Sequence, residues 1–511
     1  MDPKDYPNLH TRRSFFRHAA CAAVGTIALK ATIRDLRLIN SVMAQSGISD
    51  YKALVCVFLN GGNDSNNLII PTIPEEYASY ATLRTPVLAI PNATGSPATA
   101  LSLSPLNSDG HSYGFHPACP GLRTLFNEGK SATVFNVGTL VYPMTRVQYS
   151  ANSVARPPQL FSHSDQQIQW QTSIPDRPPS SGWGGRVTDI IHGAGVNAGG
   201  QISMAVSLAG SNTWQRGDVY QQYSVSTGGA IQLTGNVPQK NALQGILGIP
   251  QTNMQGQAYA NALNGAINEA VIVNTSIAGN ASLFNARTFS PADPELGAGP
   301  VDLFPTTITV PNGGTYNSSL TTQLKMVARL IDAGSKSIAN GGLGMKRQIF
   351  FVQVGGYDTH TGQTTASNAT PTPTNVILGA HANLFAELSR ALYGFQRAME
   401  QIGLSDKVTA FTMSDFGRTF PCNGQGSDHG WGSHHIVVGG AVNGKKTYGK
   451  WPTLTVNGPD DTSTGRWIPT MAVDQYSATL ATWFGVDSGN LSAIFPNLSR
   501  FAAPPAFMNP A

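Results

Sequence analysis

Five short runs of apolar residues recur along the chain, each followed by glycine or polar residues. They cover residues 52–59, 132–137, 348–354, 407–413 and 435–439. Runs of this length that are apolar on both faces and end in turns are typical of buried strands in a parallel sheet. The sequence therefore predicts five central strands.

Helical periodicity appears between these runs. Apolar residues spaced three and four apart, the pattern of an amphipathic helix, recur in two segments. They are Leu320, Leu324, Val327 and Ile331, followed by Leu384, Leu388, Leu392, Phe395, Met399 and Ile402. Strands separated by such helices predict an α/β fold with a mostly parallel central sheet and helices on both faces.

Three stretches lack either periodicity and are interpreted as insertions. They lie near 85–115, 210–251 and 284–317, and the last is dense in Pro, Gly and Thr. Long segments of this composition are typical of surface connections. We expect a single α/β domain over residues 45–500, preceded by a leader at 1–44 and followed by a tail at 501–511.

The net charge of +4 comes from the N-terminal segment. Seven of the 32 Lys and Arg and three of the 28 Asp and Glu lie in residues 1–44, which leaves 25 of each sign. A neutral body without a basic run is poorly suited to bind a polyanion. Nucleic-acid binding is therefore excluded as a function class.

The N-terminal segment has the pattern of an export signal. Arg12 and Arg13 are followed by Phe15 and Phe16 and then by a modest apolar stretch, as in twin-arginine signals. An ordinary amphipathic helix is the alternative, and an uncleaved tether is a further one. After this segment the sequence has no run of about 20 apolar residues, so it predicts no membrane span there. We expect export by the twin-arginine machinery to the periplasm or outside the cell.

Three cysteines remain outside the leader, at positions 56, 119 and 422. Their scatter fits neither a zinc ribbon nor a redox pair. The sequence predicts buried thiols, with a bridge between Cys119 and Cys422 as the alternative.

Acidic residues and histidines follow several of the predicted strands. They are Asp64 after the first strand, Asp358 and His360 after the third, Asp415 and Arg418 after the fourth, and Asp428, His429, His434 and His435 around the start of the fifth. Ligands of open α/β sheets collect beyond the carboxyl ends of strands. Each residue alone also fits a turn, a helix cap or a surface loop. Together they predict a metal or anion site.

Several of these motifs resemble a known family. FLNGGNDSNNLIIP, VGGYDTHTGQ and TMSDFGRTFPCNGQGSDHGWGSHHIVVGG, with the twin-arginine leader, are similar to exported bacterial proteins of domain-of-unknown-function family 1501. The resemblance spans about residues 50–490. That family is grouped with the alkaline phosphatase-like superfamily of metal-dependent phosphatases, sulfatases and phosphomutases, and has no established reaction of its own.

The resemblance implies a set of metal ligands. It assigns Asp64, Asp358, His360, Asp415 and His429 to one or two divalent ions, zinc first, with magnesium, manganese or calcium as alternatives. Phe416 stands where the superfamily has a histidine beside the aspartate. The missing ligand is either lost, which leaves a single-metal or degenerate site, or supplied from elsewhere by His434.

The resemblance also implies a nucleophile at a helix N-terminus after the second strand. Ser162 takes that place, and Ser65 is a weaker candidate. Ser162 with Asp165 also fits a plain capping box, worth about 1 kcal/mol of helix stability. His163 is expected either to act in acid–base chemistry or to pack. Arg418 is expected either to bind anionic oxygens or to form a structural ion pair.

Two functions of different classes follow. The first is an exported metal-dependent hydrolase of phosphate or sulfate esters, which acts on a small anionic ester through a serine nucleophile. The second is a non-catalytic envelope protein for binding or assembly that keeps the fold with a degenerate metal site. Seven scattered tryptophans give little support to a third, polysaccharide-binding interpretation.

Overall fold

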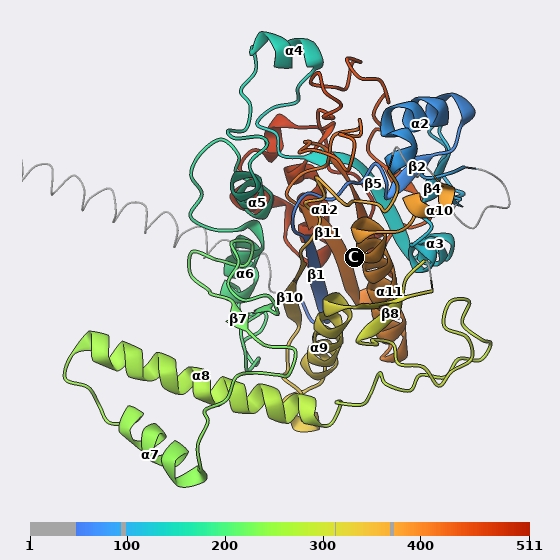
Figure 1. Ribbon diagram of the computed structural model, residues 1–511. Coiled ribbons are helices and arrows are strands. Elements are labelled where there is room, and N and C mark those ends of the chain that lie inside the picture. Colours follow the sequence, from blue (N-terminus) through green and yellow to red (C-terminus); the bar gives the residue numbers. More distant parts are fainter. Residues whose placement is uncertain (1–47, 93–98, 312, 368–371, 511) are drawn as a thin grey trace, which may run out of the picture.

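A computed structural model describes residues 48–92, 99–311, 313–367 and 372–510 of the chain (Figure 1). The predicted leader and part of the first insertion lie outside these residues. All five apolar runs form strands. They are β1 (Lys52–Leu59), β5 (Ser131–Gly138), β10 (Arg347–Val354), β11 (Val408–Ser414) and β12 (Ser433–Gly439). Nearly every residue in them is buried, which explains why they are apolar on both faces.

The main sheet is mixed and mostly parallel. Its order is β13-β5-β12-β11-β1-β10-β6-β7, and β14 pairs with β5. The short strands are β6 (Ala205–Ser207), β7 (Tyr223–Ser224), β13 (Thr447–Tyr448) and β14 (Met471–Ala472). β1 runs parallel to both β10 and β11, whereas β12 runs antiparallel to both β11 and β5. The start of β12 therefore lies at the edge where its neighbours end.

Helices cover both faces of the sheet, and β1 shows the division. Val55 and Val57 face a cluster that includes α3 (Pro120–Asn127), α9 (Ser319–Ser335) and α11 (Ala380–Gln401). Leu54 and Cys56 face a second cluster, with α6 (Trp183–Gly193), α12 (Val473–Phe484) and Trp170 of α5 (His163–Thr172). α5 and α6 lie on one side of the sheet and α3 on the other (Figure 1). The predicted fold class is confirmed.

The predicted insertions contain secondary structure. The first includes part of α2 (Pro74–Leu88), β3 (Leu101–Ser102) and β4 (Tyr113–Phe115), which pairs with β2 (Ile69–Pro71); the third includes the hairpin β8 (Thr307–Thr309) and β9 (Thr315–Asn317). The remaining helices are α4 (Arg146–Ala151), α10 (Pro373–Val376), α13 (Leu491–Ile494) and the 3-10 turns Ile338–Asn340, Ser405–Lys407, Ser488–Asn490 and Leu498–Arg500.

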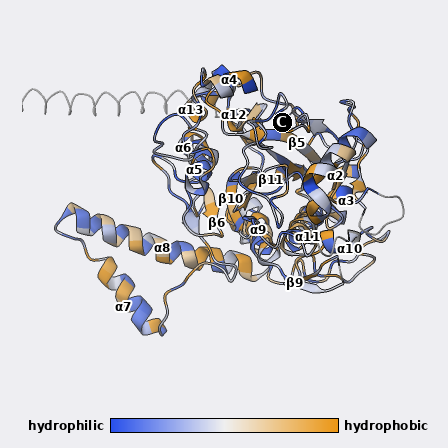
Figure 2. Ribbon diagram, turned by 45° about the horizontal axis from the view of Figure 1, so that its top comes forward, coloured by the Kyte–Doolittle hydropathy of each residue, from blue (hydrophilic) through white to orange (hydrophobic). Residues whose placement is uncertain are grey.

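Two helices project from the body as an arm, α7 (Val237–Leu247) and α8 (Met254–Ala278) (Figure 1). Hydrophilic and hydrophobic residues are interspersed along both helices (Figure 2). Among the residues described, no helix combines the length and apolarity needed to cross a membrane. Cys56 and Cys119 are buried free thiols, as predicted, and Cys422 is a partly exposed free thiol, so the alternative bridge is not formed.

Candidate metal centre

Three histidines from different parts of the chain meet at the carboxyl edge of the sheet. His163 is the first residue of α5, His360 lies in the loop after β10, and His429 precedes β12. The Nε2 atom of His429 lies 3.1 Å from Nε2 of His163 and 2.9 Å from Nε2 of His360. Convergence at one edge follows from the topology, because β12 starts where β10 and β11 end.

The carboxylate of Asp358 joins these rings. Its Oδ1 lies 3.1 Å from His360 Nε2 and 3.4 Å from His429 Nε2, and its Oδ2 lies 3.5 Å from His163 Nε2. Ligand atoms of His163, Asp358 and His429 all lie within 4.8 Å of one another. We name these three residues and His360 the imidazole centre. The exposed fractions of its side chains run from 22% for His429 to 46% for Asp358, so the centre is open to solvent.

Each imidazole is held by its other nitrogen, Nδ1. His163 Nδ1 lies 2.7 Å from Asp415 Oδ2, His360 Nδ1 lies 2.9 Å from Asp428 Oδ1, and His429 Nδ1 lies 2.8 Å from the carbonyl oxygen of Phe161. Carboxylate and carbonyl oxygens only accept hydrogen bonds, so each Nδ1 carries the proton. A neutral ring then presents a bare lone pair at Nε2.

Three such lone pairs and a carboxylate repel one another unless a proton on one ring or a metal cation lies between them. Ligating histidines in metal sites are fixed in this same way, by an acceptor on the second ring nitrogen. Zinc–nitrogen bonds of about 2.0–2.1 Å place tetrahedral ligand atoms roughly 3.3 Å apart. The separations of 2.9 and 3.1 Å between Nε2 atoms are close to that value. The donor set therefore fits a divalent metal ion.

The surroundings raise the pKa of one of these groups and lower the pKa of the others. The hydrogen bond to Asp415 raises the pKa of His163 above its usual value, although burial opposes this. Burial lowers the pKa of His429. For Asp358, burial raises the pKa, but the hydrogen bond and charge of Arg418 outweigh it, and the net shift is downward. Asp358 is therefore a carboxylate at neutral pH, ready to bind a cation.

Arg418 supports Asp358 and is fully engaged in doing so. Its Nη1 donates to Asp358 Oδ1 at 2.7 Å and to the carbonyl of Gly61 at 3.0 Å. Its Nε and Nη2 donate to the carbonyl of Ser427 at 3.1 and 2.5 Å. The side chain is fully buried. Every nitrogen of the guanidinium donates to the protein and the side chain is buried, which matches the structural alternative for Arg418.

Asp415, a predicted ligand, holds the ring of the ligand candidate His163 and lies outside the imidazole centre. Its buried carboxylate accepts hydrogen bonds from the backbone of Gly61 and from Gln167 Nε2, besides His163. Phe416 packs its ring 4.8 Å from that of His163 and 4.7 Å from that of His429, between centroids. The aromatic residue at this position supports two imidazoles from behind.

Asp64 is separated from the imidazole centre by its own partners. It forms an ion pair with Arg84, and both side chains have no exposed surface. Gln363 Nε2 donates to Asp64 Oδ2 at 2.5 Å. Burial raises the pKa of Asp64, but the charges of Arg84 and His381 outweigh it and lower the pKa overall. Asp64 is therefore the buried ion-pair partner of Arg84 in this structure, and its Oδ1 has no hydrogen-bond partner among the described residues.

His434 also lies apart from the imidazole centre. Its ring stacks on Trp451, with centroids 4.8 Å apart, and its Nδ1 accepts the backbone N–H of Asn136 at 3.1 Å. Burial lowers the pKa of His434 to about 3. The strand alternation of β12 turns this residue into the core, so the expected ligand is a neutral core histidine.

Ser162 is the N-cap residue of α5, as the capping pattern predicts, but its side chain caps nothing. Its Oγ donates to Asp165 Oδ2 at 2.6 Å. His163 was expected to act in acid–base chemistry or to pack, and the structure places it among the metal-ligand candidates. The sequence places Asp428 in the predicted cluster without a specific role, and it does not point to Gln167 at all. The adjacency of Asp428 to His429 was the available signal, whereas nothing local marks Gln167.

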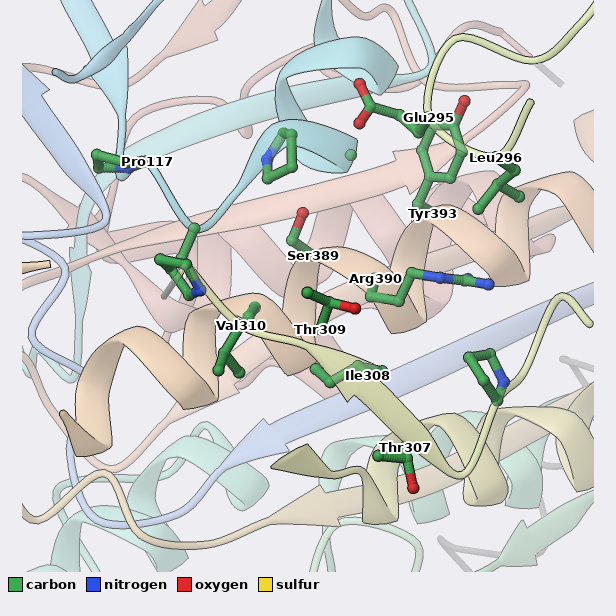
Figure 3. Close-up of a pocket in the computed structure, with 16 residues that line it drawn as sticks. Pro117, Glu295, Leu296, Thr307, Ile308, Thr309, Val310, Ser389, Arg390 and Tyr393 are labelled. Carbon is green, nitrogen blue, oxygen red and sulfur yellow. The ribbon is translucent and has the colours of Figure 1, made fainter. Parts of the chain in front are cut away.

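A separate cavity of about 450 Å³ lies between α3, α11 and β8 (Figure 3). Its polar groups have partners: the Tyr393 hydroxyl donates to Asp293, Arg390 donates to the carbonyls of Leu303 and Asp302, and Glu295 accepts from Thr124. No residue of the imidazole centre lines this cavity.

Comparison with known proteins gives a family match over part of the chain. Residues 335–487 match the family described as "Protein of unknown function (DUF1501)". This segment contains Asp358, His360, Asp415 and His429, whereas His163 lies outside it. The resemblance expected from sequence is supported to that extent. A search of curated proteins found no match.

Solved structures give only remote likenesses. One is "Crystal structure of Ps i-CgsB in complex with k-i-k-neocarrahexaose", at 10% identity and a TM-score of 0.33, covering 89% of this chain and 78% of that one. Another comes from work on metabolism of multiple glycosaminoglycans by Bacteroides thetaiotaomicron, at 10% identity and a TM-score of 0.29, covering 86% and 73%. A function for this chain therefore depends on its own side-chain geometry.

Proposed function

We propose that this protein binds a divalent metal ion at the imidazole centre and hydrolyses a phosphate or sulfate ester there. One observation carries the proposal: Nε2 lone pairs and a carboxylate converge while every Nδ1 is held by an acceptor. A donor set rich in imidazole favours zinc, because magnesium and calcium prefer oxygen ligands. A bound divalent ion supplies Lewis-acid stabilisation of the negative charge on the ester oxygens.

The chain supplies a nucleophile candidate beside this centre. Ser162 directly precedes the ligand candidate His163, and its hydroxyl donates to Asp165 at 2.6 Å. In the proposed reaction the Ser162 oxygen bonds to phosphorus or sulfur while the ester bond to the leaving oxygen breaks. Asp165 takes the hydroxyl proton, and the leaving oxygen departs as an anion that takes up a proton from solvent. Water then attacks phosphorus or sulfur, the bond to the Ser162 oxygen breaks, and inorganic phosphate or sulfate leaves while Asp165 returns its proton to the serine oxygen. The backbone N–H groups in the first turn of a helix have no carbonyl partner within it. Together with the helix dipole, those of α5 favour an anion at its N-terminus.

A second function is favoured by the pairing of Asp64 with Arg84. This pair removes one residue that a two-metal site would need, so a non-catalytic envelope protein with a single structural metal is the alternative. Metal binding without turnover would support it.

Metal analysis and an ester panel test the proposal. Purified protein should contain about one equivalent of metal by elemental analysis, and should hydrolyse 4-nitrophenyl phosphate or 4-nitrophenyl sulfate. His429→Ala should lose metal and activity, and Ser162→Ala should lose activity with metal retained. His111→Ala, which changes a histidine paired with Glu76 outside the centre, is the matched control. Protein without metal would overturn the proposal.

We also propose that the twin-arginine segment exports the folded protein. Replacing Arg12 and Arg13 with lysine should retain it in the cytoplasm, as measured by fractionation. Unchanged export of this variant would contradict the proposed route.

A further inference from the structure

Arg418 and Arg466 both bond to the loops of the imidazole centre, and their bonding differs. All the guanidinium nitrogens of Arg418 are used, as described above. Arg466 uses only Nε, which donates to the carbonyl oxygen of His429 at 2.8 Å. Within the part of the chain that the structure describes, its two terminal nitrogens have no hydrogen-bond or ion-pair partner. Arg466 is half-buried, so these nitrogens reach solvent at the rim of the centre.

The guanidinium of Arg466 is held in position by two contacts. It lies over the ring of Phe161, 4.2 Å from the centroid, besides its bond to the His429 carbonyl. Phe161 in turn accepts the Nδ1 proton of His429. Arg466 therefore sits between a metal-ligand candidate and the residue that precedes Ser162. Stacking of this kind fixes a planar guanidinium and leaves its edge free for hydrogen bonds.

The backbone beneath Arg466 is also fixed. The buried carboxylate of Asp461 accepts the backbone N–H groups of Ser463, Gly465 and Arg466 at 3.1, 2.8 and 2.9 Å. This turn therefore presents the side chain from a rigid base. A preorganised donor loses little entropy when it binds a ligand.

The charges around Arg466 leave it unpaired. Asp358, Asp415 and Asp428 each have a cationic or imidazole partner, which is Arg418, His163 and His360 in turn. Asp165 accepts the Ser162 hydroxyl. None of them pairs with Arg466. A fixed, unpaired guanidinium beside a metal-ligand set is suited to bind an anion.

We infer that Arg466 binds the charged oxygens of the substrate's ester group through its two terminal nitrogens. Phosphate and sulfate esters share this chemistry, because both present a tetrahedral group with several anionic oxygens to a forked donor. Arg466 orients the ester toward the metal, whereas Arg418 holds the protein's own carboxylate. The inference rests on the proposed function and names the residue that recognises its substrate class.

Anion binding to the metal-loaded protein tests this inference without requiring turnover. Calorimetric titration with inorganic phosphate and, separately, with inorganic sulfate should show at least tenfold weaker binding for Arg466→Ala at unchanged metal content. Arg466→Lys should be intermediate, because it keeps the charge but loses the fork. The comparison of the two titrations shows which oxyanion the site prefers. Arg156→Ala removes an arginine that stacks on Tyr149 at 4.5 Å and serves as matched control.

Each outcome separates this inference from the proposed function. Turnover and anion affinity that are both unchanged in Arg466→Ala would overturn the role of Arg466 and leave the hydrolase intact. Anion binding that depends on Arg466 in a protein without turnover would uphold the inference and overturn the hydrolase. Loss of metal from Arg466→Ala would show a structural role through the His429 backbone and would overturn the inference. A wild-type protein that binds neither anion nor turns over either ester would overturn both.

Discussion

Two aspartates lie on loops at the same edge of the sheet and differ in their exposure and in their cationic partners. Asp64 follows β1 and is paired with Arg84, with both side chains fully buried. Asp358 follows β10, is 46% exposed, and faces three imidazoles with only one side occupied by Arg418. Both aspartates follow an apolar strand. The difference shows that the counter-charge, and not the position after a strand, separates a structural carboxylate from a ligand candidate.

The largest effect is expected when the buried pair of Asp64 and Arg84 is broken. Asp64→Ala leaves Arg84 buried without its counter-ion, which should cost about 3–5 kcal/mol of unfolding free energy. Denaturant unfolding of the metal-free protein measures it. Asp64→Ala combined with Arg84→Met should be less destabilised than the sum of the single variants. A variant of normal stability that has lost metal affinity would instead make Asp64 a ligand.

Replacing a residue of the imidazole centre should weaken metal binding and leave the fold intact. His429→Ala removes one of about four ligand candidates. If their combined binding free energy is ~10–16 kcal/mol, Kd should rise on the order of 100- to 1,000-fold. The metal-free variant should unfold within about 1 kcal/mol of the wild type, because this side chain is half-buried at the rim. Metal titration and thermal unfolding with and without a chelator measure both quantities. Equal metal affinity in the variant would remove His429 from the site.

A further loss of stability is expected from the buried histidines when the pH falls below about 6.5. Burial lowers the pKa of His381 to about 4 and those of His116, His434 and His435 to about 3. The unfolded chain binds protons at these residues from pH ~6.5 downward while the folded chain does not, so stability is lost as pH falls. Each should cost about 2 kcal/mol between pH 7 and pH 5.

Unfolding of the metal-free protein at several pH values checks this sign. His435→Gln should flatten the slope, and His111→Gln, which changes a partly exposed histidine, should not. A protein that becomes more stable on acidification would contradict the assignment of neutral buried histidines.

The smallest effects should come from the carboxylates that orient the rings. Asp415 is fully buried and holds His163, whereas Asp428 is 48% exposed and holds His360. Replacement of such a partner typically costs 10–100-fold in metal affinity. We expect that range for Asp415→Asn and a smaller loss for Asp428→Asn, because water can replace an exposed acceptor. Competition with a chromophoric chelator measures both, and the reverse order would place the essential ligand at His360.

The strands were predictable because each is buried on both faces and is therefore a continuous apolar run. Such a run can be identified from the local sequence alone. The direction of β12 was not predictable, since antiparallel pairing with β11 depends on long-range contacts. The same limit applies to the site. Asp64 and Asp358 have similar local sequences, and only the arrival of Arg84 from α2 distinguishes them. His163 at the start of a helix carried no local sign of a ligand, because its neighbours come from β10 and β12 loops.

The reversal of β12 has a consequence for how this centre can change. Because β11 and β12 are antiparallel neighbours, the segment between them leaves and re-enters the sheet at one edge, and it carries Asp415, Arg418, Asp428 and His429. Residues 423–425 at its tip are exposed. Within this tip Asn423 bonds to the site, because its Nδ2 donates to the carbonyl of His360 and to Asp428 Oδ1. Length and sequence can therefore vary at residues 424 and 425 while Asn423 and the anchored flanks keep their positions. Changes at these two residues would alter the surface beside the centre without repacking the buried sheet.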